Sequence, residues 1–286
     1  METGDRNSRL ALTWKIFSRN RAAIVGAVIL IVLYGSAIFA PWIAPYEPNA
    51  TGLDNILAPP SRQHLMGTDL LGRDLLSRIL FGSRISLLIG AVAATLMIFL
   101  GVTIGAVSGY YGGLIDNFLM RFTDVVICFP SFFLILMLVA LVGPSITNII
   151  VVIGVTRWTH VARLVRGEFL SLRERDFVQS ARAVGAMPGR IMSRHLLPNA
   201  IGPIIVAATF GVATAILTES ALSYLGVGVR PPDATWGNIL HTGKAYLRTG
   251  PWLTMFPGTM IVITVLALNF VGDGLRDAFD PKAINK

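Results

Sequence analysis

Long stretches without a charged residue decide what this chain can fold into. Each is long enough for a helix to cross the hydrocarbon core of a bilayer, which takes about 20 residues. They are Ala22–Tyr46, Ile85–Ile115, Val125–Thr156, Asn199–Thr218 and Thr249–Gly272. Charged residues make up only 14% of the chain, against roughly 25% in soluble domains. The sequence therefore predicts an all-α, polytopic membrane protein.

The third run is longer than one crossing needs, and Gly143-Pro144-Ser145 divides it into two spans joined by a tight turn. The first run exceeds the about 7–15 residues of a signal-peptide core, so we expect an uncleaved span near residues 23–44. Six transmembrane helices result. The expected organisation is an N-terminal segment, 1–22, and a transmembrane domain, 23–286, with an outer loop, 45–84, and a permease-like core, 85–272.

The lysines and arginines indicate the orientation of these spans. The segments 1–22, 109–124, 157–198 and 273–286 hold 17 of them, whereas 45–84, 143–146 and 223–250 hold 7. Basic residues gather in cytoplasmic loops, so both termini are predicted to be cytoplasmic. The net charge of +8 is explained by this bias, and no nucleic-acid partner is expected.

The most basic inner segment, Arg163–Pro198, is predicted to form a docking surface for another molecule. Phe177, Ala181 and Val184 recur at helical spacing and would share one face. Gly185 interrupts this helix. Pro188 suits the first turn of a second short helix, which Pro198 is expected to end. Two short helices joined by a glycine would protrude from the membrane as a compact basic surface.

The same segment resembles a known loop. Gln179-Ser180-Ala181, then Gly185, then Leu197-Pro198 is similar to the Glu-Ala-Ala…Gly…Leu-Pro loop of bacterial ABC importer permeases. The resemblance implies that residues 163–198 carry a coupling helix that sits in a groove of an ATP-hydrolysing subunit. Gln179 and Ser180 depart from the family pattern, so no carboxylate at 179 has a role. The alternative is an ordinary solvated basic loop.

Further segments resemble the C-type permease subunit of dipeptide, oligopeptide, glutathione and nickel importers. They are Gly67-Thr68-Asp69…Gly72-Arg73-Asp74, the Leu-Gly-x-Gly-x-x-Pro-Pro…Trp-Gly pattern within 223–250, and the ending Gly272-Asp273-Gly274 onward. Thr68 or Asp69 is expected to cap a short interfacial helix before the second span. A metal site at Asp69 and Asp74 is disfavoured, because no His or Cys lies at ligand spacing beside them.

This resemblance implies the type I importer permease fold in the cytoplasmic membrane of a bacterium. It also implies a second, homologous permease subunit, two ABC ATPase subunits and an extracytoplasmic substrate-binding protein. Peptides are the expected solute, with nickel, glutathione or another small solute as alternatives. An ABC exporter and an intramembrane enzyme are less favoured.

No site for energy supply or catalysis is evident in the sequence. Gly243-Lys244 lacks the spacing and the Ser or Thr of a phosphate-binding loop. The four histidines are scattered, and Cys128 stands alone. We therefore expect no cofactor or metal in this chain, with ATP and Mg²⁺ bound by the ATPase subunits.

Glu219 directly follows the apolar run Asn199–Thr218. It lies roughly 30 Å along a helix that starts at Asn199, near the outer face of the membrane. A carboxylate there could line the outer mouth and attract the amino end of a peptide. The alternative is a salt bridge to Arg230, to Arg248 or to the second permease subunit.

Overall fold

The computed structural model describes residues 13–279, and this part of the chain forms helices and loops without a β-strand. A short helix over 13–19 precedes the others. The helices are α2 (Arg21–Ile38), α3 (Ala40–Ile43), α4 (Leu75–Tyr111), α5 (Gly113–Cys128), α6 (Ser131–Val142), α7 (Ile146–Arg173), α8 (Asp176–Ala183), α9 (Pro188–Ile191), α10 (Leu197–Tyr224), α11 (Trp236–Gly243) and α12 (Trp252–Phe279). Short 3-10 turns cover Leu53–Asn55 and Lys244–Tyr246.

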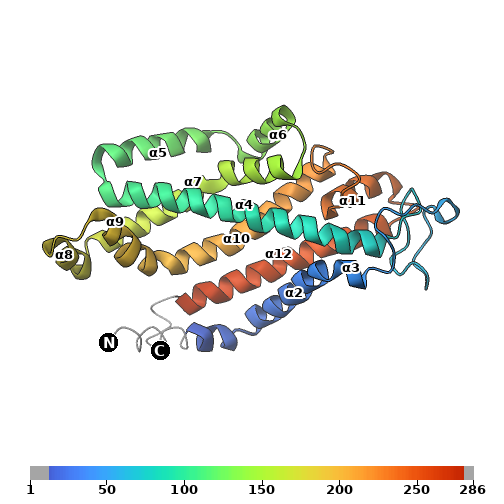
Figure 1. The fold of residues 1–286 in the computed structure, drawn as a ribbon, viewed down its shortest axis with the longest axis horizontal. Coiled ribbons are helices and arrows are strands. Elements are labelled where there is room, and N and C mark those ends of the chain that lie inside the picture. The colour runs from blue at the N-terminus through green and yellow to red at the C-terminus, as the bar shows by residue number, and fades with distance from the viewer. Residues whose placement is uncertain (1–12, 280–286) are drawn as a thin grey trace.

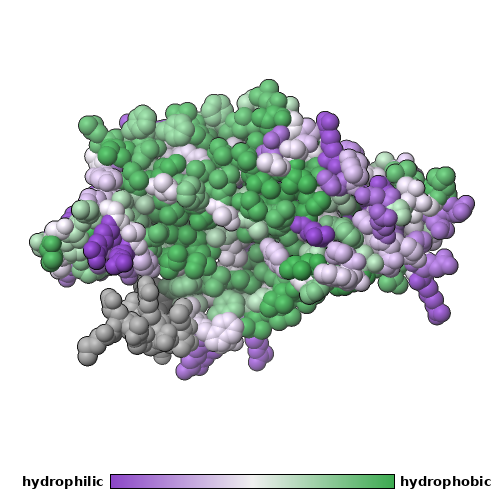
Figure 2. Space-filling model, in the orientation of Figure 1, coloured by the Kyte–Doolittle hydropathy of each residue, from purple (hydrophilic) through white to green (hydrophobic). Residues whose placement is uncertain are grey.

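Five helices are long and apolar enough to cross a membrane: α2, α4, α7, α12 and the continuous helix formed by α9 and α10. A sixth crossing is the pair α5 and α6, which is bent by 83°. The predicted six spans are thus found when this pair counts as one broken span. They run side by side along the molecule (Figure 1), and apolar surface covers its middle between polar ends (Figure 2).

The break between α5 and α6 was not predicted, because residues 109–124 were assigned to an inner segment, whereas α5 covers Gly113–Cys128 and belongs to the span. Phe129 has an extended backbone, with φ −86° and ψ 128°. Pro130 follows it, and a proline disfavours helical backbone in the residue before it. The expected turn at Gly143 is present, with a φ of +89° that favours glycine.

Helix α4 runs parallel to α7 and packs closely against it, with Leu96 against Gly154 and Gly109 against Phe169. A Cβ added at Gly105 would come within 2.4 Å of the carbonyl oxygen of Ala162 on α7. Such close approach of backbones is the usual role of glycine between membrane helices. The pair α4 and α7 therefore forms a rigid centre on which the other spans are arranged.

The start of α4 differs from the prediction. The helix begins at Leu75, and Asp74 caps it by accepting a hydrogen bond from the Ser77 amide at 2.8 Å. No separate interfacial helix precedes it. Thr68 and Asp69 shape the outer loop instead: Thr68 Oγ1 accepts from the Ala58 amide at 2.8 Å, and Asp69 Oδ1 accepts from the Arg73 amide at 3.0 Å. The expected cap was wrong, because the side-chain oxygens of Thr68 and Asp69 accept hydrogen bonds from amides within the loop.

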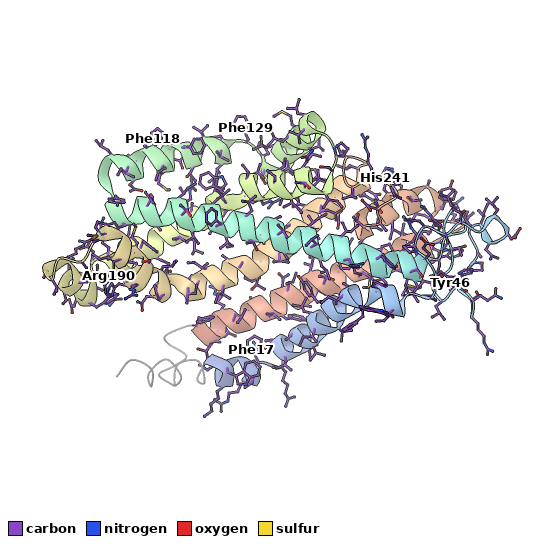
Figure 3. The ribbon with its side chains drawn as sticks, viewed as in Figure 1. Phe17, Tyr46, Phe118, Phe129, Arg190 and His241 are labelled. Atoms are coloured by element: carbon purple, nitrogen blue, oxygen red, sulfur yellow. The ribbon has the colours of Figure 1, made fainter. Side chains whose placement is uncertain are left out.

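The two ends of the bundle differ in character. The loop before α4 and helix α11 gather at one end, and α8 lies at the other (Figure 1). Figure 3 places Tyr46 and Arg190 at these opposite ends. Near the α8 end, Asn20 Nδ2 donates to Asp277 Oδ2 at 3.4 Å. The beginning of α2 and the end of α12 are therefore in contact at the same end of the bundle. An even number of crossings places them on the same side.

Candidate functional site

Helix α8 is a short, firmly anchored helix at one end of the molecule. Val178 is fully buried and belongs to an apolar cluster with Phe169 of α7 and Ile191 of α9. Asp176 in the first turn and Arg182 in the last turn complement the helix dipole. The helix is therefore fixed to the ends of two long helices, although it has only eight residues.

Gly185 ends α8 as predicted. Its φ is +79°, and its amide donates to the Arg182 carbonyl at 2.9 Å. The amide of Ala186 donates to the Ala181 carbonyl at 3.0 Å. These two bonds form the Schellman arrangement, in which glycine takes the left-handed position. The turn reverses the chain and places Met187 and Pro188 beside the end of α8.

The apolar side chains on this end lie on the surface. Val184 is 88% exposed, Met187 78% and Phe177 41%. Of the face predicted from spacing, Phe177 and Val184 are thus outward, while Val178 is the buried anchor. Exposed arginines surround them, namely Arg175, Arg182 and Arg190, and Figure 3 shows Arg190 at this end. Exposed apolar side chains rimmed by charge are typical of a protein-docking surface.

The predicted loop residues fall on different parts of this end. Gln179 and Ser180 are exposed on α8, and Ala181 is half-buried. Leu197 and Pro198 do not end a second short helix, which corrects the prediction. The helix that begins at Pro188 runs on to Tyr224.

A π-helical stretch, Met192–Leu196, makes this continuity possible. The Leu197 amide donates to the Met192 carbonyl, and Pro198 follows at the first turn of α10. One wide turn therefore absorbs the amide that Pro198 lacks, so the helix is not interrupted. The apolar cluster that holds Val178 of α8 also includes Ala200 and Ile204 of α10.

Ion pairs join α5 to α7 near the same end. Arg166 binds Asp116 through both nitrogens of its fork, and Ser108 of α4 also donates to Asp116. Arg163 Nη2 lies 2.5 Å from Asp124 Oδ1. These arginines were predicted to lie in the protruding basic loop 163–198. Helix α7 instead continues to Arg173, so they belong to the span.

Glu219 is fully buried, which corrects the expectation that it lines the outer mouth. Its carboxylate accepts from Ser223 Oγ at 2.7 Å and from Ser220 Oγ at 3.4 Å. Within residues 13–279 it forms no salt bridge with Arg230 or Arg248. The reason is that α11 folds back over this turn: a Cβ added at Gly237 would lie 2.7 Å from Ser220 Cα.

The disfavoured metal site also gains no support. His64 Nδ1 lies 2.9 Å from Asp74 Oδ1, a contact that the sequence did not suggest. Asp69 is engaged by Arg73 at 2.7 Å instead. Across residues 13–279, no three His, Cys, Asp or Glu side chains gather as a metal site would require.

Arg157 was predicted to begin the basic inner segment 157–198, and this placement was wrong. It lies within α7, and its Nη2 donates to Thr218 Oγ1 of α10 at 3.2 Å. Its Nε is buried without a hydrogen-bond partner among the described residues. The only sequence signal was that Arg157 follows the charge-free run directly.

Comparison with known proteins agrees with this architecture. The family described as "Binding-protein-dependent transport system inner membrane component" matches residues 101–285, and "N-terminal TM domain of oligopeptide transport permease C" matches 8–60. The dipeptide transport system permease protein DppC of Alkalihalophilus pseudofirmus is 42% identical over 94% of this chain and 88% of its own. The oligopeptide transport system permease protein OppC of Bacillus subtilis is 42% identical over 93% of this chain and 87% of its own.

Solved structures give the same fold. A chain from an inward-facing crystal form of the MetNI methionine ABC transporter has a TM-score of 0.57 at 21% identity. The match covers 72% of this chain and 98% of that one. A second crystal form of that transporter has a TM-score of 0.56.

Proposed function

This chain belongs to the family of binding-protein-dependent transport system inner membrane components, and on that premise we propose that it carries dipeptides or oligopeptides through a bacterial cytoplasmic membrane. It is a multi-pass membrane protein and a permease subunit of an ABC importer. The single observation that supports a peptide solute is 42% identity to dipeptide and oligopeptide permeases over nearly the whole chain.

The proposal divides the work among several polypeptides. This chain and a second, homologous permease would form the passage, and a binding protein on the outer side would deliver the solute. Two ABC ATPase subunits would hold ATP and Mg²⁺. The exposed apolar side chains Phe177, Val184 and Met187 at the α8 end support an ATPase subunit as the occupant of that surface.

The packing of α8 suggests how ATP binding would reach the passage. Val178 anchors α8 in a cluster shared with α7 and α10, and α9 is continuous with α10. A rigid-body movement of a docked ATPase would therefore shift α7 and α10 together. Such displacement of packed helices is a common way to switch between two arrangements. Gln179, Ser180, Ala181, Gly185, Leu197 and Pro198 remain the proposed coupling residues.

The orientation follows from the same reasoning. We place α8 and both termini in the cytoplasm, since the inner segments hold 17 of the 24 basic residues. The loop before α4 and helix α11 then face the outside, where a binding protein would approach.

ATP hydrolysis by the reconstituted complex tests the solute. The complex is assembled in nanodiscs with its two ATPase subunits, and binding protein is added empty or loaded with dipeptide, pentapeptide, glutathione or Ni²⁺. We expect stimulation that is strongest with peptide-loaded protein. Stimulation by Ni²⁺ or glutathione with none by peptides would assign the chain to one of the alternative importers.

A further inference from the structure

Arg157 stands out because it carries a charge in the middle of a span. Helix α7 begins at Ile146 and ends at Arg173. At about 1.5 Å per residue, Arg157 lies roughly 16 Å from one end and roughly 24 Å from the other. An arginine at that depth is costly and is retained where it meets a partner or lines a pathway for a polar solute.

The charge partner of Arg157 is missing from the described part of the chain. Arg163 and Arg166, on the same helix, each bind an aspartate of α5. Arg157 has only the neutral hydroxyl of Thr218, at 3.2 Å, and its buried Nε has no hydrogen-bond partner in residues 13–279. The nearby acidic residue of α10, Glu219, is satisfied by Ser223. The guanidinium is thus left with donors unused.

Arg157 lines two cavities. One, of about 240 Å³, is bounded by Arg157 and Leu164 of α7 and by Ala207, Gly211 and Thr214 of α10. These positions recur every three or four residues toward the α8 end, so the cavity extends from Arg157 along both helices. It is therefore placed where a solute would pass toward the cytoplasm.

The second cavity lies at the break in the α5–α6 span. It has a volume of about 90 Å³ and is lined by Phe129 and Ser131 at the break and by Thr156, Arg157 and His160 of α7. Non-helical backbone at membrane depth occurs where it is enclosed by protein or lines a water-filled space. The break in the span and Arg157 therefore border the same cavity. His160 borders both cavities.

We propose that Arg157 binds a carboxylate of the solute during its passage, the terminal carboxylate in the case of a peptide. This inference rests on the proposed peptide function and adds a recognition site within the membrane. A planar guanidinium forms two parallel hydrogen bonds with a carboxylate, and every unmodified peptide carries such a group at its C-terminus. The apolar walls supplied by Phe210 and Leu164 would accept varied side chains.

Uptake of matched peptide pairs tests this proposal. The full complex, in proteoliposomes with its binding protein and ATP, receives a labelled peptide with a free C-terminus or its C-terminal amide. The ratio of the two uptake rates is compared between wild type and Arg157→Gln. Any preference of the binding protein itself is the same in both complexes and cancels in this comparison.

We expect Arg157→Gln to lower the ratio about tenfold, equivalent to about 1.4 kcal/mol, through loss of uptake of the free acid. Arg157→Lys keeps the charge without the fork and should lower it less. Arg84→Gln, which removes an exposed arginine of α4, should leave the ratio unchanged. If Arg157→Gln does not assemble, the lysine variant alone decides, since an unchanged ratio there overturns the bidentate site.

Other outcomes separate the possible causes. An equal fall in uptake of the peptide acid and the peptide amide, accompanied by poorer assembly, would mean that Arg157 pairs with a carboxylate of the second permease subunit. That result would overturn the proposal. Wild-type uptake of peptides with an unchanged ratio in the variant would overturn this inference alone. Absence of peptide uptake by the wild-type complex would remove the proposed function and this inference with it.

Discussion

Arg166 of α7 binds both carboxylate oxygens of Asp116 of α5, from Nε to Oδ1 at 2.5 Å and from Nη2 to Oδ2 at 2.6 Å. The side chains of Asp116 and Arg166 are 12% and 34% exposed, so solvent screens this pair less than the half-exposed pair of Arg163 and Asp124. Since α5 is amphipathic and its span is bent, the pair is a principal link between α5 and the rigid centre formed by α4 and α7.

Asp116→Asn should therefore destabilise the protein, since it leaves the Arg166 fork without its counter-charge. We expect a loss of about 1–3 kcal/mol, seen as a lower melting temperature in detergent. Asp124→Asn is the matched control, because both side chains of the Arg163–Asp124 pair are about half exposed. Pairs of that kind contribute less than about 1 kcal/mol. Equal losses in the two variants would contradict the account of α5.

Gly185→Arg should leave the protein in the membrane but separate it from its ATPase subunits. A non-glycine residue at a φ of +79° strains the turn by about 1–2 kcal/mol, and the new cation would alter the exposed surface of α8. Gly143→Arg is the control, because Gly143 has a similar φ and equally open surroundings at another loop. Co-purification of the ATPase subunits should fall only for Gly185→Arg. Wild-type co-purification and transport in that variant would disprove the role of the turn.

Cysteine labelling tests the orientation. In a Cys128→Ser background, Ser180→Cys should react with an impermeant thiol reagent only from the cytoplasmic side. Ser61→Cys should react only from outside. Both side chains are exposed, so burial would not hide either thiol. Labelling from the opposite sides would overturn the six-span topology.

Glu219→Gln should affect stability and not the choice of peptide. The buried carboxylate accepts from Ser223 and is closed off from the outer surface, so it has no access to a peptide amino group. We expect equal uptake changes for peptides with free and with acetylated amino termini. Glu219→Ala, which leaves the hydroxyl of Ser223 without this acceptor, should melt at a lower temperature than Glu219→Gln. A selective loss for free amino termini would restore the outer-mouth role.

Much of the architecture was readable from local sequence. Charge-free runs located the spans because charged side chains are too costly in lipid. Gly185 marked the turn after α8 because only glycine takes its backbone conformation without strain. The peptide-permease motifs pointed to the family to which the chain belongs.

The remaining features depend on contacts between distant segments. The burial of Glu219 results from α11 folding back on α10, which no local pattern shows. Pro130 and Pro198 illustrate a second limit: one breaks a span and the other is absorbed by a π-helical turn. Arg157 lies next to a basic segment in sequence, yet α7 continues past it to Arg173 and places it within the helix of a span.

ATP-driven accumulation of a labelled peptide in proteoliposomes tests the central claim most directly. The complex contains this chain, the second permease and two ATPase subunits, and the binding protein is added outside. We predict accumulation that requires ATP and the binding protein. Val184→Asp, which places a charge on the exposed apolar end of α8, should abolish accumulation while the isolated ATPase subunits still hydrolyse ATP. Undiminished accumulation in Val184→Asp, or accumulation without the ATPase subunits, would contradict the account.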